Sequence, residues 1–287
     1  MGATVPPRPT ATARQQRLGA ELRKLRERAG LTTRAAGQKL GVDPARISNI
    51  ESGRFGVSAD RVRAFAFGYD CDDKPYLDAL ATMTTVRSRN WWDDYRDLLP
   101  PVLLDLSEME EHATALRTVQ FTHLPGLLQT ADYARLVFQQ NVPALSPPMV
   151  EHRLSHRIKR QGILYADAPT PYTAIIHEAA LRMQFGGPEV MRKQLAHIAE
   201  MSDREHVTVL VLPFAAGIFP GAGQTVVIAQ GPVRQLDTVQ LDTEHGSEFL
   251  YAEAQLVKYR TIMGRMEDLS LDAPASRNLI HTLITDL

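Results

Sequence analysis

The sequence contains a single cysteine among its 287 residues and has no long apolar run. Cys71 has no partner for an intrachain disulfide and no cysteine neighbour with which to build a zinc site. No apolar segment approaches the roughly 20 residues needed to cross a bilayer, and the N-terminus lacks the apolar stretch of a signal peptide. These absences argue against redox, structural-zinc and membrane roles and lead us to expect a cytoplasmic protein.

Net charge is also nearly absent, at −1 for the whole chain, but the charges are unevenly distributed. Residues 1–69 contain 13 Lys and Arg against 5 Asp and Glu, whereas residues 70–287 contain 19 against 28. Because neutralisation of phosphates supplies much of the affinity for nucleic acids, this asymmetry favours a basic DNA-binding module joined to an acidic body.

The length and the hydrophobic content of 44% suit about two globular domains. Residues 1–13 are rich in Pro, Thr and Ala and are expected to form a disordered tail, in which Arg8 could still touch DNA. Helical patterns predict an all-α domain over residues 14–70 and a helical connector over residues 71–99. Residues 100–287 mix helical and strand-like patterns and predict a larger α+β domain.

The α+β domain contains runs such as VTVLVL and TVVIA that lack clean alternation, which indicates strands covered on both faces. Helices are expected near residues 106–119, 131–141, 147–162, 188–201, 253–266 and 273–287, and strands near 208–213, 225–229, 235–242 and 248–252.

The N-terminal domain carries clear helix-capping and turn signals. Thr32 can cap a second helix that runs to Leu40, and Gly41 supplies the turn after it. Asp43 can cap a third helix with Pro44 at its first position, where a missing N–H costs nothing. The four expected helices lie near residues 14–29, 33–40, 44–51 and 58–69.

The segment GLTTRAAGQKLGVDPARISNIESGR, residues 30–54, resembles the repressor-type helix-turn-helix family, often called the XRE family. The resemblance covers about residues 18–69 and rests on the ordered features GLTT, GV, IS, IE and SG. It implies a domain that binds double-stranded DNA through its third helix. It also implies an ion pair between Arg26 and Glu51.

The third helix is expected to read DNA bases. Ile47 and Ile50, three residues apart, anchor this helix to the core and leave the other face outward. Asn49 is the best candidate for direct readout, because an amide can form two hydrogen bonds with adenine. The residues expected to face the bases are Pro44, Ala45, Ser48 and Asn49.

Other residues are expected to hold the DNA backbone. Thr33 begins the second helix, where an amide and a hydroxyl can bind a phosphate. Arg46 and Arg54 are expected to contact phosphates, and Gln38 either a phosphate or a base. Gly37 stands where alanine is usual in the family, and we expect it to loosen the second helix by about 1 kcal/mol.

The second domain contains LPGLLQTADYA at residues 124–134, IIHEAAL at 175–181 and VTVLVLPF at 207–214. Together these segments look like the domain that follows the helix-turn-helix in a large group of actinobacterial regulators, and the resemblance covers about residues 96–283. That domain has no firmly assigned biochemical activity. The resemblance implies regulators that are often encoded beside a small partner protein, some of them described as antitoxin-like.

Catalytic, cofactor and metal chemistry finds little support. His152 and His156 lie four residues apart, as metal ligands on a helix would, but Arg153 and Arg157 beside them would repel a cation. The glycine-containing segment 219–224 lacks the lysine and the spacing of a phosphate-binding loop. We therefore expect no catalytic, cofactor-binding or metal-binding residues.

These observations together predict a homodimeric, nucleoid-associated transcription regulator, since a symmetric pair of reading helices can recognise two half-sites. Its α+β domain would respond to a small molecule or a partner protein, and residues 125–129 could line a pocket there. One alternative is an antitoxin-like protein whose C-terminal domain mainly holds a small partner protein. An enzyme fused to a DNA anchor is a further alternative, and it would need a cleft of convergent ionisable groups.

Overall fold

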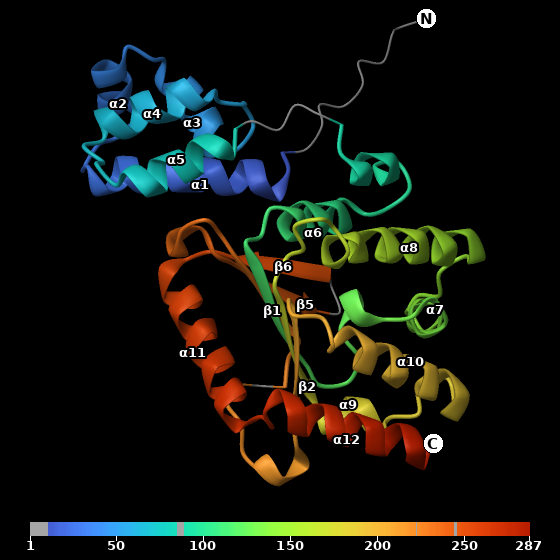
Figure 1. The fold of residues 1–287 in the computed structure, drawn as a ribbon. Helices are drawn as coiled ribbons and strands as arrows, with labels where there is room; N and C mark the ends of the chain where they lie inside the picture. Colours follow the sequence, from blue (N-terminus) through green and yellow to red (C-terminus); the bar gives the residue numbers. More distant parts are fainter. Residues whose placement is uncertain (1–10, 85–88, 222, 244–245) are drawn as a thin grey trace, which may run out of the picture. The chain divides into compact units, whose positions relative to one another are not determined.

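The computed structural model describes residues 11–84, 89–221, 223–243 and 246–287. It contains two compact units that divide between Arg89 and Asn90 (Figure 1). This division falls inside the segment 71–99, so that segment is shared between the units. Residues 1–10, including Arg8, lie outside the described residues. Within the described part of the chain, no helix is long and apolar enough to span a membrane.

The first unit is all-α, and a polar side chain caps the start of each helix. Thr32 Oγ1 accepts a hydrogen bond from the N–H of Ala35 at 3.1 Å, and the Asp43 carboxylate accepts one from the N–H of Ala45 at 2.7 Å. Both caps expected from the sequence are confirmed. The helices are α1 (Ala13–Arg28), α2 (Thr33–Leu40), α3 (Pro44–Glu51), α4 (Ala59–Gly68) and α5 (Lys74–Thr82).

Helix α5 is an integral part of this first unit. It packs on α4, and the hydroxyl of its buried Tyr76 donates a hydrogen bond of 2.6 Å to the Glu21 carboxylate of α1. Leu80 of α5 is fully buried, as are Leu22 of α1 and Ile47 of α3. The first unit therefore has five helices among its described residues: the four expected before residue 70, and α5, which was expected to belong to the helical connector.

The second unit is built on a six-stranded mixed sheet with the strand order β3-β2-β1-β4-β5-β6. The first three strands in the chain pair in parallel, and the others join them antiparallel. The α+β class expected from the sequence is confirmed. The strands are β1 (Ala115–Gln120), β2 (Tyr172–His177), β3 (Val207–Leu212), β4 (Val226–Gln230), β5 (Thr238–Thr243) and β6 (Gly246–Leu250).

Two central strands differ from the expectation. The helix expected over residues 106–119 is wrong in its second half, because α6 (Pro101–Glu111) ends and β1 begins at Ala115. Leu116 and Val119 share one face of a helical pattern, but in the strand they enter the two different cores on either side of the sheet. β2 was not expected as a strand, because its apolar run of Ala174, Ile175 and Ile176 is shorter than the runs of β3 and β4.

Helices cover both faces of this sheet (Figure 1). One face packs against α7 (Ala131–Gln139), α9 (Glu178–Arg182), α10 (Pro188–Met201) and α12 (Ala273–Asp286), and the other against α11 (Glu253–Leu269). Strands β3 and β4 contribute to both cores, as their sequences indicated. The remaining elements are α8 (Pro147–Arg160) and the 3-10 helices η1 (Trp91–Tyr95), η2 (Gly126–Leu128), η3 (Gln161–Leu164), η4 (Phe214–Ala216) and η5 (Arg234–Leu236).

Candidate nucleic-acid interface

The turn between α2 and α3 is closed by backbone hydrogen bonds. Gly41 follows α2 in the left-handed conformation, with φ of 64°, and its N–H donates to the carbonyl of Gly37. The N–H of Val42 donates to the same carbonyl at 2.9 Å. This is the usual end of a helix at a left-handed glycine, and it sets the direction in which α3 leaves the turn.

Gly37 has a different role from the one expected. A Cβ atom at this position would lie 2.6 Å from the carbonyl oxygen of Val42 and 3.1 Å from the Pro44 ring. Only glycine lets the chain after the turn approach α2 this closely. Gly37 therefore permits the packing of the turn, and the structure corrects the interpretation that it merely loosens α2.

The inner face of α3 is fixed to α1 in three ways. Ile47 and Ile50 are 0% and 2% exposed. The backbone of α1 passes so close to the end of α3 that a Cβ atom on Gly19 would lie 2.5 Å from the Ile50 carbonyl oxygen. Arg26 donates to both carboxylate oxygens of Glu51, from Nε at 2.6 Å and from Nη2 at 2.9 Å.

The ion pair also reaches the loop before α2, because Arg26 Nη1 donates to the carbonyl of Leu31 at 2.7 Å. The hydrogen bonding that Arg26 donates to Glu51 is the main cause that raises the pKa of Arg26 above its ordinary value. A single guanidinium thus ties together the end of α3, α1 and the approach to α2. The ion pair that the family resemblance implies is present.

The outer face of α3 carries the residues expected to face bases. Asn49 is half-buried, and within the described part of the chain its side-chain amide has no hydrogen-bond partner. Its backbone carbonyl accepts from the N–H of Phe55 at 3.1 Å, which holds the loop after α3 against the helix. The exposed residues of this face are Pro44, Ala45, Arg46 and Ser48.

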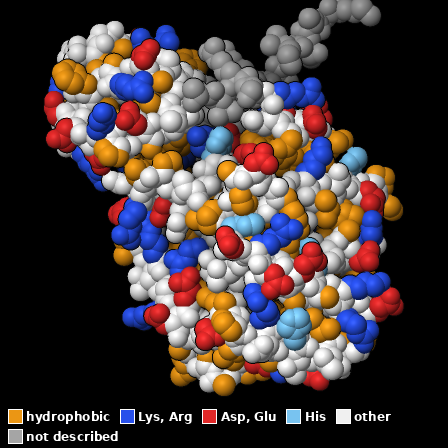
Figure 2. All heavy atoms as spheres, viewed as in Figure 1, with side chains coloured by type: hydrophobic (Ala, Val, Ile, Leu, Met, Phe, Trp, Pro, Cys, Tyr) orange, Lys and Arg blue, Asp and Glu red, His pale blue; other side chains and the backbone are white. Residues whose placement is uncertain are grey.

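The residues expected to hold phosphates lie on three segments around this face. Gln38 of α2, Arg46 of α3 and Arg54 after α3 are exposed, and Thr33 is half-exposed at the start of α2. Arg34, next to Thr33, is also exposed and was missed, although its place in the first turn of α2 could have indicated it. Figure 2 shows basic and acidic side chains together on the face of the first unit in view.

These exposed arginines differ from Lys39, a neighbouring exposed basic residue of α2. Among the described residues, Arg34, Arg46 and Arg54 have no acidic partner, whereas Lys39 of α2 pairs with Asp70 at 3.0 Å. An unpaired exposed guanidinium can bind a phosphate without first breaking an internal ion pair. The helix-turn-helix segment thus offers an amide on α3 flanked by positive charges.

The second unit carries the residues that were considered for a metal site and for a pocket. Within the described residues there is no group of three or more His, Cys, Asp or Glu side chains that could hold a metal ion. Residues 125–129 are packed into the core, with Leu127 and Leu128 buried. Gln129 is also buried, and its side-chain oxygen accepts a hydrogen bond from Arg157 of α8.

Comparisons with known proteins agree with this division. Residues 17–79 match a family described as "Helix-turn-helix domain", and the match ends within α5. This match indicates DNA binding and transcription regulation, and it points to a DNA-binding regulator rather than an enzyme. Neither curated proteins nor solved structures gave a significant match.

A second match covers residues 103–282, which is more than half of the chain. It begins in α6 and ends in α12, so it spans nearly the whole second unit. The chain therefore belongs to the family described as "Domain of unknown function (DUF5753)", and it carries that domain behind a DNA-binding helix-turn-helix.

Proposed function

We propose that the protein is a sequence-specific transcription regulator that reads DNA through α3. The observation that carries this proposal is the division of α3 into two faces. Ile47 and Ile50 are locked into the bundle, while the unbonded amide of Asn49 remains on the outward side. A helix held in this way can enter the major groove and present an amide to an adenine edge.

The phosphate contacts come from the exposed residues around α3. Arg46 and Arg54 hold the DNA backbone, together with Thr33 and Gln38 of α2. These contacts set the register of the protein on the duplex but carry no sequence information. The base sequence is read by Asn49, Ser48, Pro44 and Ala45.

The active species is a homodimer bound to two half-sites. One α3 helix of eight residues reaches only a few base pairs, so a unique site in a genome requires two of them. The protein is an XRE-type member of the actinobacterial group that its segments resemble, and it resides on the nucleoid.

The second unit controls DNA binding by responding to a small molecule. It has its own two cores around a complete sheet, which is far more structure than dimerisation requires. Its excess of acidic over basic residues keeps it away from the phosphates of the DNA backbone. A ligand changes regulation only if it binds one arrangement of the protein more tightly than another.

The test compares the full chain with a fragment of residues 14–84 on the native target site in cells. We expect the fragment to bind the site in vitro, because it holds the described core of the first unit, but to lose its response to the native signal. Full regulation by the fragment would contradict control by the second unit. Loss of the response on deletion of a neighbouring small protein gene would instead favour the antitoxin-like alternative.

A further inference from the structure

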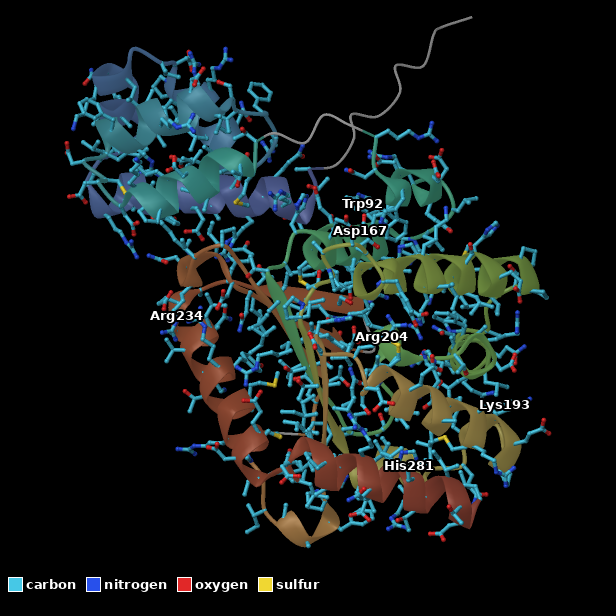
Figure 3. The ribbon with its side chains drawn as sticks, in the orientation of Figure 1. Trp92, Asp167, Lys193, Arg204, Arg234 and His281 are labelled. Atoms are coloured by element: carbon cyan, nitrogen blue, oxygen red, sulfur yellow. The ribbon has the colours of Figure 1, made fainter. Side chains whose placement is uncertain are left out.

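A pocket of about 170 Å³ lies in the second unit, between α6, α7 and α8. Figure 3 shows the side chains that fill the space between α7 and α8. Part of the wall is apolar, including Phe138 of α7. The polar part is mostly basic and consists of Asn141, Arg153, His156, Arg157 and Arg160.

The three arginines of this wall differ in whether an acidic side chain balances their charge. Arg160 is buried and donates two hydrogen bonds to the Glu110 carboxylate, at 2.7 and 2.5 Å. Among the described residues, Arg157 donates only to a neutral acceptor, the side-chain oxygen of Gln129, and its guanidinium carbon lies 4.2 Å from the centre of the Phe138 ring. Within the described part of the chain, Arg153 and Arg157 therefore lack an acidic partner in contact.

One polar atom of each side chain is also left without a hydrogen bond. The Nε atoms of Arg153 and Arg157 are both buried and have no hydrogen-bond partner within the described residues. Burial lowers the pKa of Arg157 to about 9 and lowers that of Arg153. Both side chains are half-buried, and charges withdrawn from water are ordinarily paired in proteins. Two guanidinium groups without an acidic partner beside one pocket therefore indicate a missing anion.

His156 does not supply the missing partner. Burial, followed by the nearby charges of Arg160, Arg157 and Lys159, lowers the pKa of His156 to about 3, so the ring is neutral at pH 7. Its Nε2 atom lies 2.8 Å from the hydroxyl of Ser107. Asp242 of β5 acts on Arg157 and Arg160 at longer range, and its Oδ1 accepts hydrogen bonds from Gln240 and Ser247.

We propose that this pocket binds a small oxyanion group, a phosphate or a carboxylate, held by Arg153 and Arg157. Guanidinium groups bind both kinds of oxyanion through paired N–H donors. The pocket is smaller than the 300–1,000 Å³ or so of sites for drug-sized ligands, so it holds the charged group of a ligand and a short apolar part against Phe138.

Helix α8, which carries Arg153 and Arg157, also contacts η1, near the start of the second unit. The Tyr95 hydroxyl of η1 lies 2.8 Å from the hydroxyl of Ser155 on α8, and the rings of Trp91 and His156 are 5.5 Å apart. An oxyanion on Arg153 and Arg157 would therefore act on the same helix that positions η1. We expect the bound oxyanion to change DNA binding through this helix. That coupling rests on the proposed function, whereas oxyanion binding itself does not.

The test measures binding of inorganic phosphate and of acetate to the full chain by calorimetry, at constant pH and ionic strength in chloride buffer. We expect saturable binding of at least one of them, and at least tenfold weaker binding by Arg153→Gln and Arg157→Gln. Arg192→Gln, an exposed arginine on α10, serves as the matched control and should bind as the wild type does. A preference for phosphate or for acetate identifies the ligand's charged group.

Absence of saturable binding of either anion would overturn the site, as would unchanged binding by a folded Arg153→Gln variant. If the Arg157→Gln variant does not fold, anion binding by the Arg153→Gln variant alone tests the site. DNA binding is measured in the same samples. Phosphate or acetate binding that leaves DNA affinity unchanged would refute the coupling, whereas absence of DNA binding with intact anion binding would refute the proposed function alone.

Discussion

Arg26 and Glu51 join α1 to the last residue of α3 through two hydrogen bonds of 2.6 and 2.9 Å. The two side chains are 8% and 6% exposed, so the pair lies within the bundle rather than on its surface. The orientation of the proposed DNA-reading helix therefore depends on one buried ion pair in addition to apolar packing.

Glu51→Ala should strongly destabilise the first unit, because it leaves the Arg26 charge buried without its partner. Removing one member of a buried pair costs about 3–5 kcal/mol. Hydrogen exchange of the α1 and α3 amides in the full chain measures this loss. Arg23→Ala breaks the exposed pair with Glu27 on the same helix and should cost far less. Equal effects of the two variants would show that the buried pair has no special role.

Gly37→Ala should destabilise the helix-turn-helix, although alanine is the better helix former by about 1 kcal/mol. The new Cβ atom would overlap the Val42 carbonyl and push the turn away from α2. Gly56→Ala is the matched control, since no atom lies within 4 Å of a Cβ there. Thermal unfolding and DNA binding of both variants test this prediction. A Gly37→Ala variant as stable as the wild type would refute the steric role.

The second unit should lose stability in acid through His156. The pKa of His156 is lowered to about 3 by burial, whereas an unfolded histidine titrates near 6.5. Below pH 6.5 the unfolded chain binds a proton that the folded chain does not, so stability is complete above this pH and falls toward pH 3. The slope reaches about 1.4 kcal/mol per pH unit.

Denaturant unfolding at pH 7 and pH 5, followed by tryptophan fluorescence, measures this effect, because both tryptophans of the chain lie in η1 near α8. His156→Gln should reduce the loss between these pH values by about 2 kcal/mol. His281→Gln, an exposed histidine of α12 (Figure 3), should leave it unchanged. If both variants lose stability as the wild type does, the titration belongs to other groups.

DNA contacts should separate into base and phosphate classes. Asn49→Ala should reduce discrimination at one base pair of each half-site by about 1–3 kcal/mol. Arg46→Ala and Arg54→Ala should weaken binding to all sequences and flatten the dependence of affinity on salt. Titrations at several salt concentrations on specific and random duplexes measure both quantities. An equal loss on both duplexes for Asn49→Ala would remove it as a base reader.

The first unit was largely predictable from sequence because its determinants are local. Thr32, Gly41 and Asp43 act within a few residues of their own position, so their capping and turn roles can be inferred without a fold. The role of Gly37 could not, because the close approach of the Val42 carbonyl appears only when α3 has folded back on α2.

The second unit was less predictable because a short strand buried on both faces shows neither alternation nor a long apolar run. β2 presents Ala174, Ile175 and Ile176 in succession, and all three are fully buried. The pocket was missed because its partners are distant in the chain: Arg160 pairs with Glu110, 50 residues away. From sequence alone, Arg153 and Arg157 indicated only that a metal ion would be repelled.

The proposal that α3 reads DNA is tested most directly by selecting binding sites from a random pool of duplexes with the full-length protein. The proposal predicts enrichment of a two-fold symmetric sequence whose half-sites lie about 10 base pairs apart, or a multiple of this spacing. It further predicts that Asn49→Ala selects a site relaxed at one position of each half-site. A pool that remains random after selection with folded protein would contradict it.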